Sequence, residues 1–308
     1  VTTDVSREGA QRHGLVAGAG VALSRASTAG LLLATLTKGG ERVTLQIVGN
    51  GPLGQVTVDA DDAGNVRAYL QRGSVLVGGG LERVSLANAI GRQGVVSVIR
   101  DLGRKERYSG QSRIVTGEID EDVENYLRTS EQITSALGCE AVLADDSAIR
   151  VAGGVLVQCL PGFDRAEGAP ARGPASPGRD ASSRIENDHI VREVQHKLRT
   201  GELYQRLMHG GWGDPVGVAR ALLDTDDVDV LDRRPVKFRC SCSRERVVVP
   251  MPDPGATLLA AWPYREAANV LERVASKPST EAWTRETSIS RSPPTQRTSC
   301  ARCSTGSA

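Results

Sequence analysis

Residues 43–70 read VTLQIVGNGPLGQVTVDADDAGNVRAYL, and this stretch decides the fold class. It contains three runs in which apolar residues alternate with polar ones, and two short segments rich in Gly, Pro, Asp and Asn separate the runs. A period of two is typical of a strand with one buried face, and Gly-rich connections between such runs favour tight hairpins. The segment therefore predicts three consecutive antiparallel strands.

Helical and further strand signals flank this meander. Residues 21–36 are mostly small or apolar, which predicts a helix buried on most sides. Residues 117–137 predict a second helix, because acidic side chains crowd its first turns, where they favour the positive end of the helix dipole. Further short strands are expected at 75–77, 95–100 and 149–157. The pattern predicts an α+β core domain with a mainly antiparallel sheet and packed helices.

The composition excludes several classes of protein. The chain has 308 residues, of which 39% are apolar and 3% aromatic, so its core must consist mostly of Val, Leu, Ile and Ala. Its 38 Lys and Arg nearly balance 37 Asp and Glu, which gives no overall field to attract nucleic acid. No run approaches the roughly 18–20 consecutive apolar residues that span a bilayer. Since no secretory signal opens the sequence either, we expect a cytoplasmic protein with no membrane or nucleic-acid partner.

The composition changes after Pro161. Residues 162–181 are dominated by Gly, Ala, Pro, Arg and Asp, which is typical of a linker. A helical pattern follows over 187–208, and Pro215, preceded by Asp214 as N-cap, begins a short helix that ends at Leu223. Three parts are therefore expected: an α+β core domain at 1–161, a partly helical linker at 162–229, and a Cys-rich C-terminal redox or zinc region, partly disordered, at 230–308.

Three patterns that look catalytic have simpler structural interpretations. Residues 49–54, GNGPLG, match the string of dinucleotide-binding loops, but a strand follows them instead of a helix, so we expect a hairpin turn. His189 and His196 are expected on a solvated helix surface. The acidic group at 118–124 is explained by a helix N-terminus. Because Gly-x-Ser-x-Gly and His-Glu-x-x-His motifs are also absent from the sequence, we expect no enzyme active site.

The cysteines are the most informative residues. Cys139 and Cys159 stand alone in apolar strand-like contexts and are interpreted as small core residues. The other four form a Cys-x-Cys pair and a Cys-x-x-Cys pair, and four thiolates suit tetrahedral Zn2+. These pairs are Cys240 with Cys242, and Cys300 with Cys303. Spacing alone leaves two interpretations open, a shared zinc site or independent thiols, and the flanking arginines would stabilise oxidisable thiolates in either case.

Four long segments carry a family resemblance: LLLATLTKGGERVTLQIVGNGPLGQVTVDADDAGNVRAYL (31–70), VIRDLGRKERYSGQSRIVTGEIDEDVENYLRTSEQITSAL (98–137), VAGGVLVQCLPG (151–162) and VLDRRPVKFRCSCSRERV (230–247). They strongly resemble the heat shock protein 33 family of redox-regulated holdase chaperones. The resemblance implies an α+β core domain, a helical linker, and a C-terminal module whose four Cys bind zinc when reduced and form disulfides under oxidative stress. Cys240 and Cys242 match the family's Cys-x-Cys, and Cys300 with Cys303 would be its Cys-x-x-Cys. Residues 248–299 differ from the short module that joins the two pairs in the family.

The function that the resemblance implies is an ATP-independent chaperone, not an enzyme, which binds unfolding client proteins and dimerises when oxidised. In the reduced state, zinc would fold the tail and dock it on the linker helices. The apolar side chains that the tail would then cover are Val191, Val194, Leu198, Leu203 and Leu207. Two other functions stay open: a thiol-disulfide oxidoreductase that uses Cys300 and Cys303, and a constitutive zinc-stabilised binding module without a redox switch.

Overall fold

The computed structural model describes residues 1–15, 17–37, 39–73, 83–103, 107–159, 179–210 and 215–240. Residues Val1–Arg239 form one compact unit, and the chain from Cys240 onward belongs to a second. The first unit contains two sheets and the helices that pack on them, including the helices that follow residue 178. It has an α+β architecture with mainly antiparallel strand pairing, as predicted.

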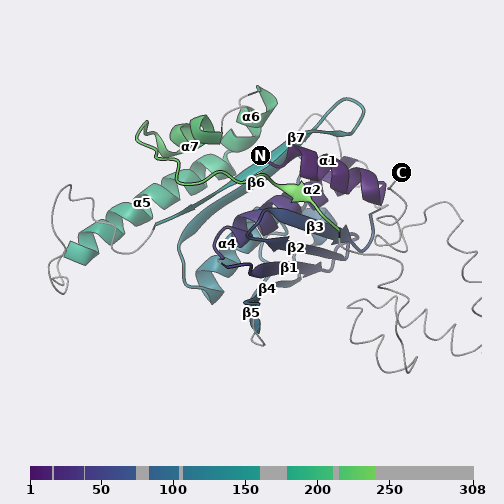
Figure 1. The fold of residues 1–308 in the computed structure, drawn as a ribbon, viewed down its shortest axis with the longest axis horizontal. Helices are drawn as coiled ribbons and strands as arrows, with labels where there is room; N and C mark the ends of the chain where they lie inside the picture. The colour runs from purple at the N-terminus through teal and green to yellow at the C-terminus, as the bar shows by residue number, and fades with distance from the viewer. Residues whose placement is uncertain are drawn as a thin grey trace, which may run out of the picture. The chain divides into compact units, whose positions relative to one another are not determined.

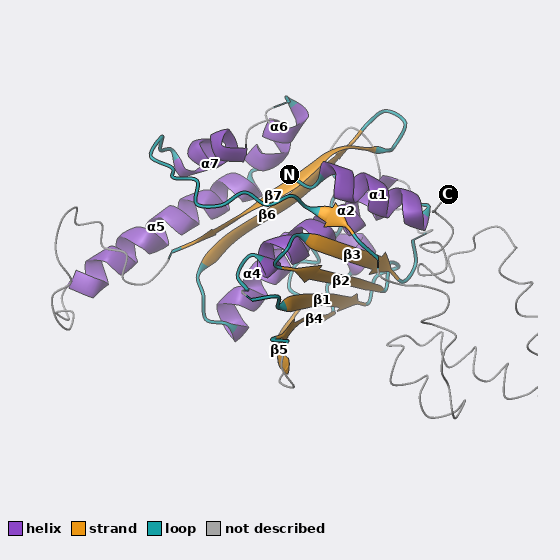
Figure 2. Ribbon diagram, in the orientation of Figure 1, coloured by secondary structure: helices purple, strands orange, loops and turns teal. Residues whose placement is uncertain are grey.

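The larger sheet has six strands in the order β5-β4-β1-β2-β3-β8 (Figures 1 and 2). Every pairing in it is antiparallel except that of β3 with β8. Its strands are β1 Arg42–Gly49, β2 Gln55–Asp61, β3 Asn65–Leu70, β4 Gly94–Asp101, β5 Arg107–Arg113 and β8 Lys237–Phe238. The predicted three-strand meander is confirmed, and residues 49–54 form the β1–β2 turn, closed by a hydrogen bond from the Gly49 N–H to Gly54 O at 3.1 Å.

The buried helix α2 connects the two sheets. It spans Ala17–Ala34 and packs on β1–β3 of the large sheet and on β6–β7 of the small one. Close packing needs small residues here, because a Cβ at Gly30 would lie 2.6 Å from Val58 Cγ1. Helix α2 is long and apolar enough to cross a membrane, but 89% of it is buried inside the protein, as is typical of a core helix.

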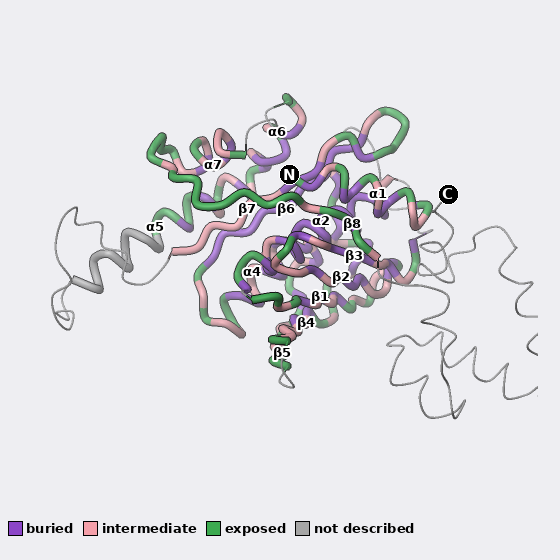
Figure 3. Tube along the Cα trace, in the orientation of Figure 1, coloured by how far each residue is buried: buried purple, intermediate pink, exposed green. Residues whose placement is uncertain are grey.

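The smaller sheet is a long hairpin formed by β6 Ser135–Leu143 and β7 Ile149–Gln158. Helices α2 and α4 pack against β6, and so do α5 and α6, which leaves every residue of β6 buried (Figure 3). The remaining helices are α1 Thr3–His13, α3 Ala87–Ile90, α4 Ile119–Ser130, α5 Arg179–Arg199, α6 Glu202–Met208 and α7 Pro215–Leu223. The hairpin is therefore a middle layer between the core helices and α5–α7.

Two sequence predictions about element boundaries were wrong. The helix expected over 117–137 ends at Ser130, where the chain turns through Gln132 at φ +59° and then enters β6. The helix expected over 187–208 begins earlier, at Arg179, and is divided at Gly201, whose φ of +83° interrupts it. The strand expected at 75–77 and most of the linker expected at 162–181 lie outside the described residues.

Candidate functional site

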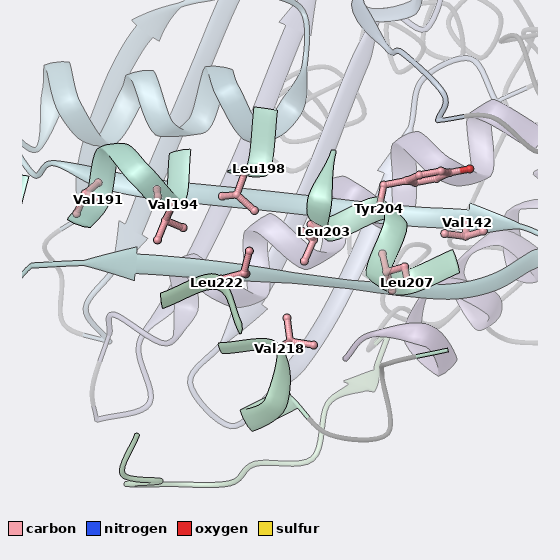
Figure 4. Close-up of a cluster of buried hydrophobic side chains, with 10 residues drawn as sticks. Val142, Val191, Val194, Leu198, Leu203, Tyr204, Leu207, Val218 and Leu222 are labelled. Atoms are coloured by element: carbon pink, nitrogen blue, oxygen red, sulfur yellow. The ribbon is translucent and has the colours of Figure 1, made fainter. Parts of the chain in front are cut away.

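Helices α5 and α6 dock on the hairpin, and α7 packs on α5, through one apolar cluster, which we call the linker cluster (Figure 4). Its side chains come from all three helices and from one face of β6, with less buried members on β7. The buried members are Ala136, Val142, Val191, Val194, Leu198, Leu203, Tyr204, Leu207, Val218 and Leu222. Full burial of a Val or Leu side chain is worth about 1.5–3 kcal/mol. Apolar contact therefore supplies most of the attraction between the helices and the hairpin.

This arrangement corrects the expectation that the C-terminal tail covers Val191, Val194, Leu198, Leu203 and Leu207. The hairpin and α7, all within Val1–Arg239, already bury these side chains. The physical reason is that β6 is mostly apolar and buried on both faces, so its second face needs a cover as much as the helices do. Separation of α5–α7 from the hairpin would therefore expose apolar faces on both the helices and the hairpin.

Gly138 allows α5 and α6 to approach β6 closely. A Cβ at this position would lie 2.7 Å from Leu198 Cδ2 and 3.0 Å from Leu203 Cδ2. Real Cβ atoms essentially never come within 3.0 Å of another heavy atom. The docking of α5 and α6 on β6 therefore depends on the missing side chain of Gly138.

A polar contact adjoins the linker cluster at Glu124 of α4. Its Oε1 accepts hydrogen bonds from Arg199 Nη2 at 2.9 Å and from Gln195 Nε2 at 3.0 Å, both on α5. Its Oε2 accepts the N–H of Leu137 in β6 at 3.1 Å. Burial raises the pKa of the Glu124 carboxyl, while Arg199 opposes that rise. Three donors converge on one carboxylate, which fixes the position of α5 on the core.

The other acidic residues at 118–124 hold the core together, and their arrangement is more specific than a helix dipole requires. Asp122 accepts the backbone N–H groups of Val115, Thr116 and Gly117 at 2.8–3.0 Å, which fixes the turn before α4. Glu118 and Asp120 pair with a cation from another helix, described next. These carboxylates therefore all have structural partners.

Arg25 is the largest fully buried side chain of the described residues, and no motif in the sequence singles it out. Its Nε donates to Cys139 O at 2.7 Å, Nη1 pairs with Glu118 at 2.9 Å, and Nη2 pairs with Asp120 at 2.8 Å. Burial acts to lower the pKa of Arg25, but the carboxylates, Asp120 foremost, outweigh it and raise that pKa. A single arginine within the apolar stretch 17–34 was the only signal in the sequence. Arg25 ties α2 to α4 and β6 beneath the hairpin.

The predicted zinc ligands lie at and beyond the end of the first unit. Cys240 is half-buried and follows directly after β8 and Arg239. Cys242, Cys300 and Cys303 lie outside the described residues, so their positions relative to Cys240 stay a prediction. Within the described ranges, no group of three or more His, Cys, Asp or Glu has an arrangement that could hold a metal. Thiolate sulfur suits zinc, so the donor chemistry of the pairs fits this ion.

The two remaining cysteines belong to the fold, as expected. Cys139 is fully buried on β6, and Cys159 is partly buried against the linker cluster. Burial raises the pKa of the Cys139 thiol, and the nearby Asp120 carboxylate raises it further. His189 and His196, also as expected, lie exposed on α5.

Cys139 should therefore be chemically inert in the folded chain. A raised pKa lowers the thiolate fraction at any given pH, and the thiolate is the reactive species. We expect iodoacetamide at pH 8 to modify Cys139 at least about tenfold more slowly in the folded than in the urea-unfolded chain. Mass spectrometry of tryptic peptides measures both rates. Equal rates would contradict the burial of this thiol.

The comparisons with known proteins agree with this architecture. The family model described as Hsp33 protein matches residues 1–250. Among curated relatives named 33 kDa chaperonin, that of Geobacter sulfurreducens is 34% identical over 247 residues, covering 80% of this chain and 74% of its own length. That of Lactiplantibacillus plantarum is 37% identical over 246 residues, covering 79% of this chain and 75% of its own length.

A solved structure extends the likeness to three dimensions. The crystal structure of the 33 kDa chaperonin, a heat shock protein 33 homolog, from Thermotoga maritima superposes with a TM-score of 0.64 at 28% identity. The superposition covers 83% of this chain and 78% of the homolog. The matched family segment includes Cys240 and Cys242 but ends before Cys300 and Cys303. With a family match across most of the sequence and relatives above 30% identity, the chain belongs to the Hsp33 family.

Proposed function

We propose that this protein is a redox-regulated, ATP-independent chaperone that holds unfolding proteins under oxidative stress. The observation that supports it best is the linker cluster, an apolar interface between α5–α7 and the β6–β7 hairpin that lies in the chain shortly before Cys240. The relatives' name, 33 kDa chaperonin, supports a chaperone and gives no indication of an enzyme.

Opening of this interface would create the binding surface for clients, by which we mean unfolding proteins. When α5–α7 leave the hairpin, apolar side chains on both sides lose their partners, among them Leu198 and Leu203 on the helices and Val142 on β6. Large exposed apolar surfaces bind other apolar surfaces, and an unfolded client offers many. The free energy of binding comes from this burial, so no nucleotide is required. A bound client is withdrawn from aggregation by mass action.

The cysteines would control the opening. Cys240, Cys242, Cys300 and Cys303 would hold Zn2+ as thiolates in the reduced state, and the bound ion would contribute folding free energy to the C-terminal unit. Under stress, two thiolates form each disulfide and give up two electrons to hydrogen peroxide, whose O–O bond breaks and whose oxygens take up two protons from solvent and leave as two water molecules. Disulfide formation removes the ligands and with them the support of the tail. A cytoplasm that keeps thiols reduced would keep the switch closed.

Zinc and thiol counting test this proposal on the full chain. We expect one zinc per reduced chain, none after peroxide, and the loss of four thiols of the six cysteines. A Cys300→Ser/Cys303→Ser chain should bind zinc at least about tenfold more weakly, whereas a Cys159→Ser control should bind normally. No zinc in freshly purified, reduced protein would contradict the switch.

Aggregation of a heat-unfolded client gives the functional readout. The parent chain should suppress light scattering only after peroxide treatment, and sedimentation of the same samples reports whether oxidation produces the homodimer. Equal suppression before and after peroxide would instead favour a constitutive zinc-stabilised binding module. Catalysis of disulfide exchange in a reduced, denatured substrate would favour an oxidoreductase.

A further inference from the structure

The edge of β3 holds a short segment of the chain itself. Strand β8 pairs with β3 through only two residues, Lys237 opposite Asn65 and Phe238 opposite Val66. The Lys237 N–H donates to Gly64 O at 2.9 Å, and the Arg239 N–H donates to Val66 O at 2.8 Å. Parallel pairing is slightly weaker per residue than antiparallel pairing, and a two-residue strand is short. Strand β8 is therefore a weakly held occupant of this edge.

One aromatic side chain anchors β8. Phe238 is only 7% exposed, whereas its neighbour Lys237 is exposed. Three residues of α1 surround the ring: Gly9, Arg12 and His13. The Arg12 guanidinium lies 5.8 Å from the ring centroid, the His13 ring lies 6.4 Å from it edge-on, and a Cβ at Gly9 would lie 3.2 Å from Phe238 Cε2. We call this set the Phe238 contact site.

The edge itself extends beyond its present occupant. Because Val66 bonds outward to β8, the alternation of a strand directs the backbone groups of Ala68 and Leu70 to the same side. In the part of the chain that the structure describes, β8 is the outermost strand and pairs with nothing past Val66. A longer extended segment could therefore pair with this edge at more positions than β8 does.

The chain on both sides of β8 leaves room for its release. Residues 224–235, which lead from α7 to β8, are almost all exposed, and Leu231 among them is 95% exposed. The second unit begins at Cys240, immediately after the hydrogen bond from Arg239. Rearrangement of the chain at Cys240 would thus act directly on the end of β8, without passing through another element.

We propose that β8 is an internal stand-in for a client, and that the β3 edge with the Phe238 contact site is a second client-binding site, separate from the linker cluster. Its ligand is an extended segment of an unfolded protein that carries an aromatic side chain. Backbone pairing with β3 gives affinity for any extended chain, and the Phe238 contact site selects the aromatic residue. In the resting state β8 occupies the site, and this occupancy lowers the apparent affinity of the site for other chains. This inference rests on the proposed chaperone function for the identity of the ligand.

Peptide binding to the full chain tests the proposal. The probe is a fluorescein-labelled peptide with the sequence of residues 233–239, RRPVKFR, and the readout is fluorescence anisotropy. A Phe238→Ala chain should bind it at least about tenfold more tightly than the parent chain, because the internal competitor is weakened. A Leu231→Ala chain is the matched control, since it loses a large side chain from the same exposed connection and should bind like the parent. Peptides carrying Phe238→Ala or Lys237→Pro should lose at least about tenfold in affinity, since they lack the ring or the donor N–H.

Several results would overturn the proposal. One is that a folded Phe238→Ala chain and a folded Arg239→Pro chain, which lacks the N–H bonded to Val66, both bind the peptide no better than the parent does. Another is that a variant with β8 released does not bind the peptide but sediments as a dimer, which would mean that the β3 edge binds a second copy of the chain. If the variants do not fold, hydrogen exchange of the parent chain provides the test. An excess of the peptide should accelerate exchange of the Arg239 backbone N–H, and an unchanged exchange rate overturns the proposal. Peptide binding without aggregation suppression would contradict only the proposed function.

Discussion

Gly138→Val is expected to make the reduced chain suppress client aggregation without any oxidant. The new side chain would meet Leu198 and Leu203, since even its Cβ would lie 2.7 Å and 3.0 Å from their Cδ atoms. Overpacking of this kind costs about 1–3 kcal/mol, which is a factor of roughly 5–150 in the equilibrium between docked and released helices. Light scattering of a heat-unfolded client measures the activity, and limited proteolysis measures release of α5–α6.

A valine at Gly154 is the matched control. Gly154 lies on the neighbouring strand, but its Cβ would point to the other face of the hairpin, 2.6 Å from Thr28 Cγ2 of α2 and 2.6 Å from the backbone oxygen of Gly138. Gly154→Val should therefore lower the stability of the whole core without freeing α5–α6 selectively. If the reduced Gly138→Val chain stays inactive while its α5–α6 segment becomes sensitive to protease, release of these helices does not create the client surface.

The sequence predicted strands β1–β4 of the large sheet because each of them has one mainly buried face, but it did not predict β5, which has no buried residue, or the two-residue β8. The alternation at Val43, Leu45 and Ile47 reports that asymmetry directly, and these three residues are buried as the pattern requires. Residues 135–143 show no alternation, because helices cover both faces of β6. A strand buried on both sides cannot be distinguished from a buried helix by its period, which is why the preceding helix was extended to residue 137.

Because a strand buried on both faces shows no alternation, the sequence also does not reveal which surface covers the linker helices α5 and α6. The apolar face of α5 is visible as a helical pattern at Val191, Val194 and Leu198, which indicates that some surface covers it, but the C-terminal tail was the wrong partner. The sequence does not identify β6 as the covering surface, because the helical pattern predicted over 117–137 extends into β6. For the cysteines the limit is different. Residue type and spacing indicate zinc chemistry, but only the placement of Cys240 is described, so the shared site stays a prediction.

Arg25 shows a third limit of sequence reasoning. Its partners Glu118, Asp120 and Cys139 are 93, 95 and 114 residues away along the chain. Periodicity and local motifs carry no information about such distant pairs. A charged residue within an otherwise apolar helix does indicate that a partner of opposite charge must exist, because burial of an unpaired charge is too costly. Only the fold shows which of the acidic residues provide it.

Arg25→Met should therefore destabilise the folded unit more than any surface substitution. Methionine keeps much of the apolar volume but leaves two carboxylates and the Cys139 carbonyl without their donor. Breaking a buried ion pair by removal of one partner costs about 3–5 kcal/mol. Urea unfolding followed by circular dichroism measures the loss. The partly exposed pair of Arg67 with Asp59, 2.7 Å apart, gives the control: Arg67→Met should cost no more than about 1 kcal/mol.

A double-mutant cycle separates loss of charge pairing from loss of packing. Asp120→Asn removes a buried charge but keeps an oxygen that can accept the Cys139 N–H. If the uncompensated carboxylate causes the damage, Arg25→Met/Asp120→Asn should be more stable than the sum of the single effects predicts, by about 1–3 kcal/mol. If loss of packing causes the destabilisation, the losses in unfolding free energy of the two single variants should add. Additive losses would mean that Arg25 holds α2 against α4 and β6 through its size, and that its charge contributes little.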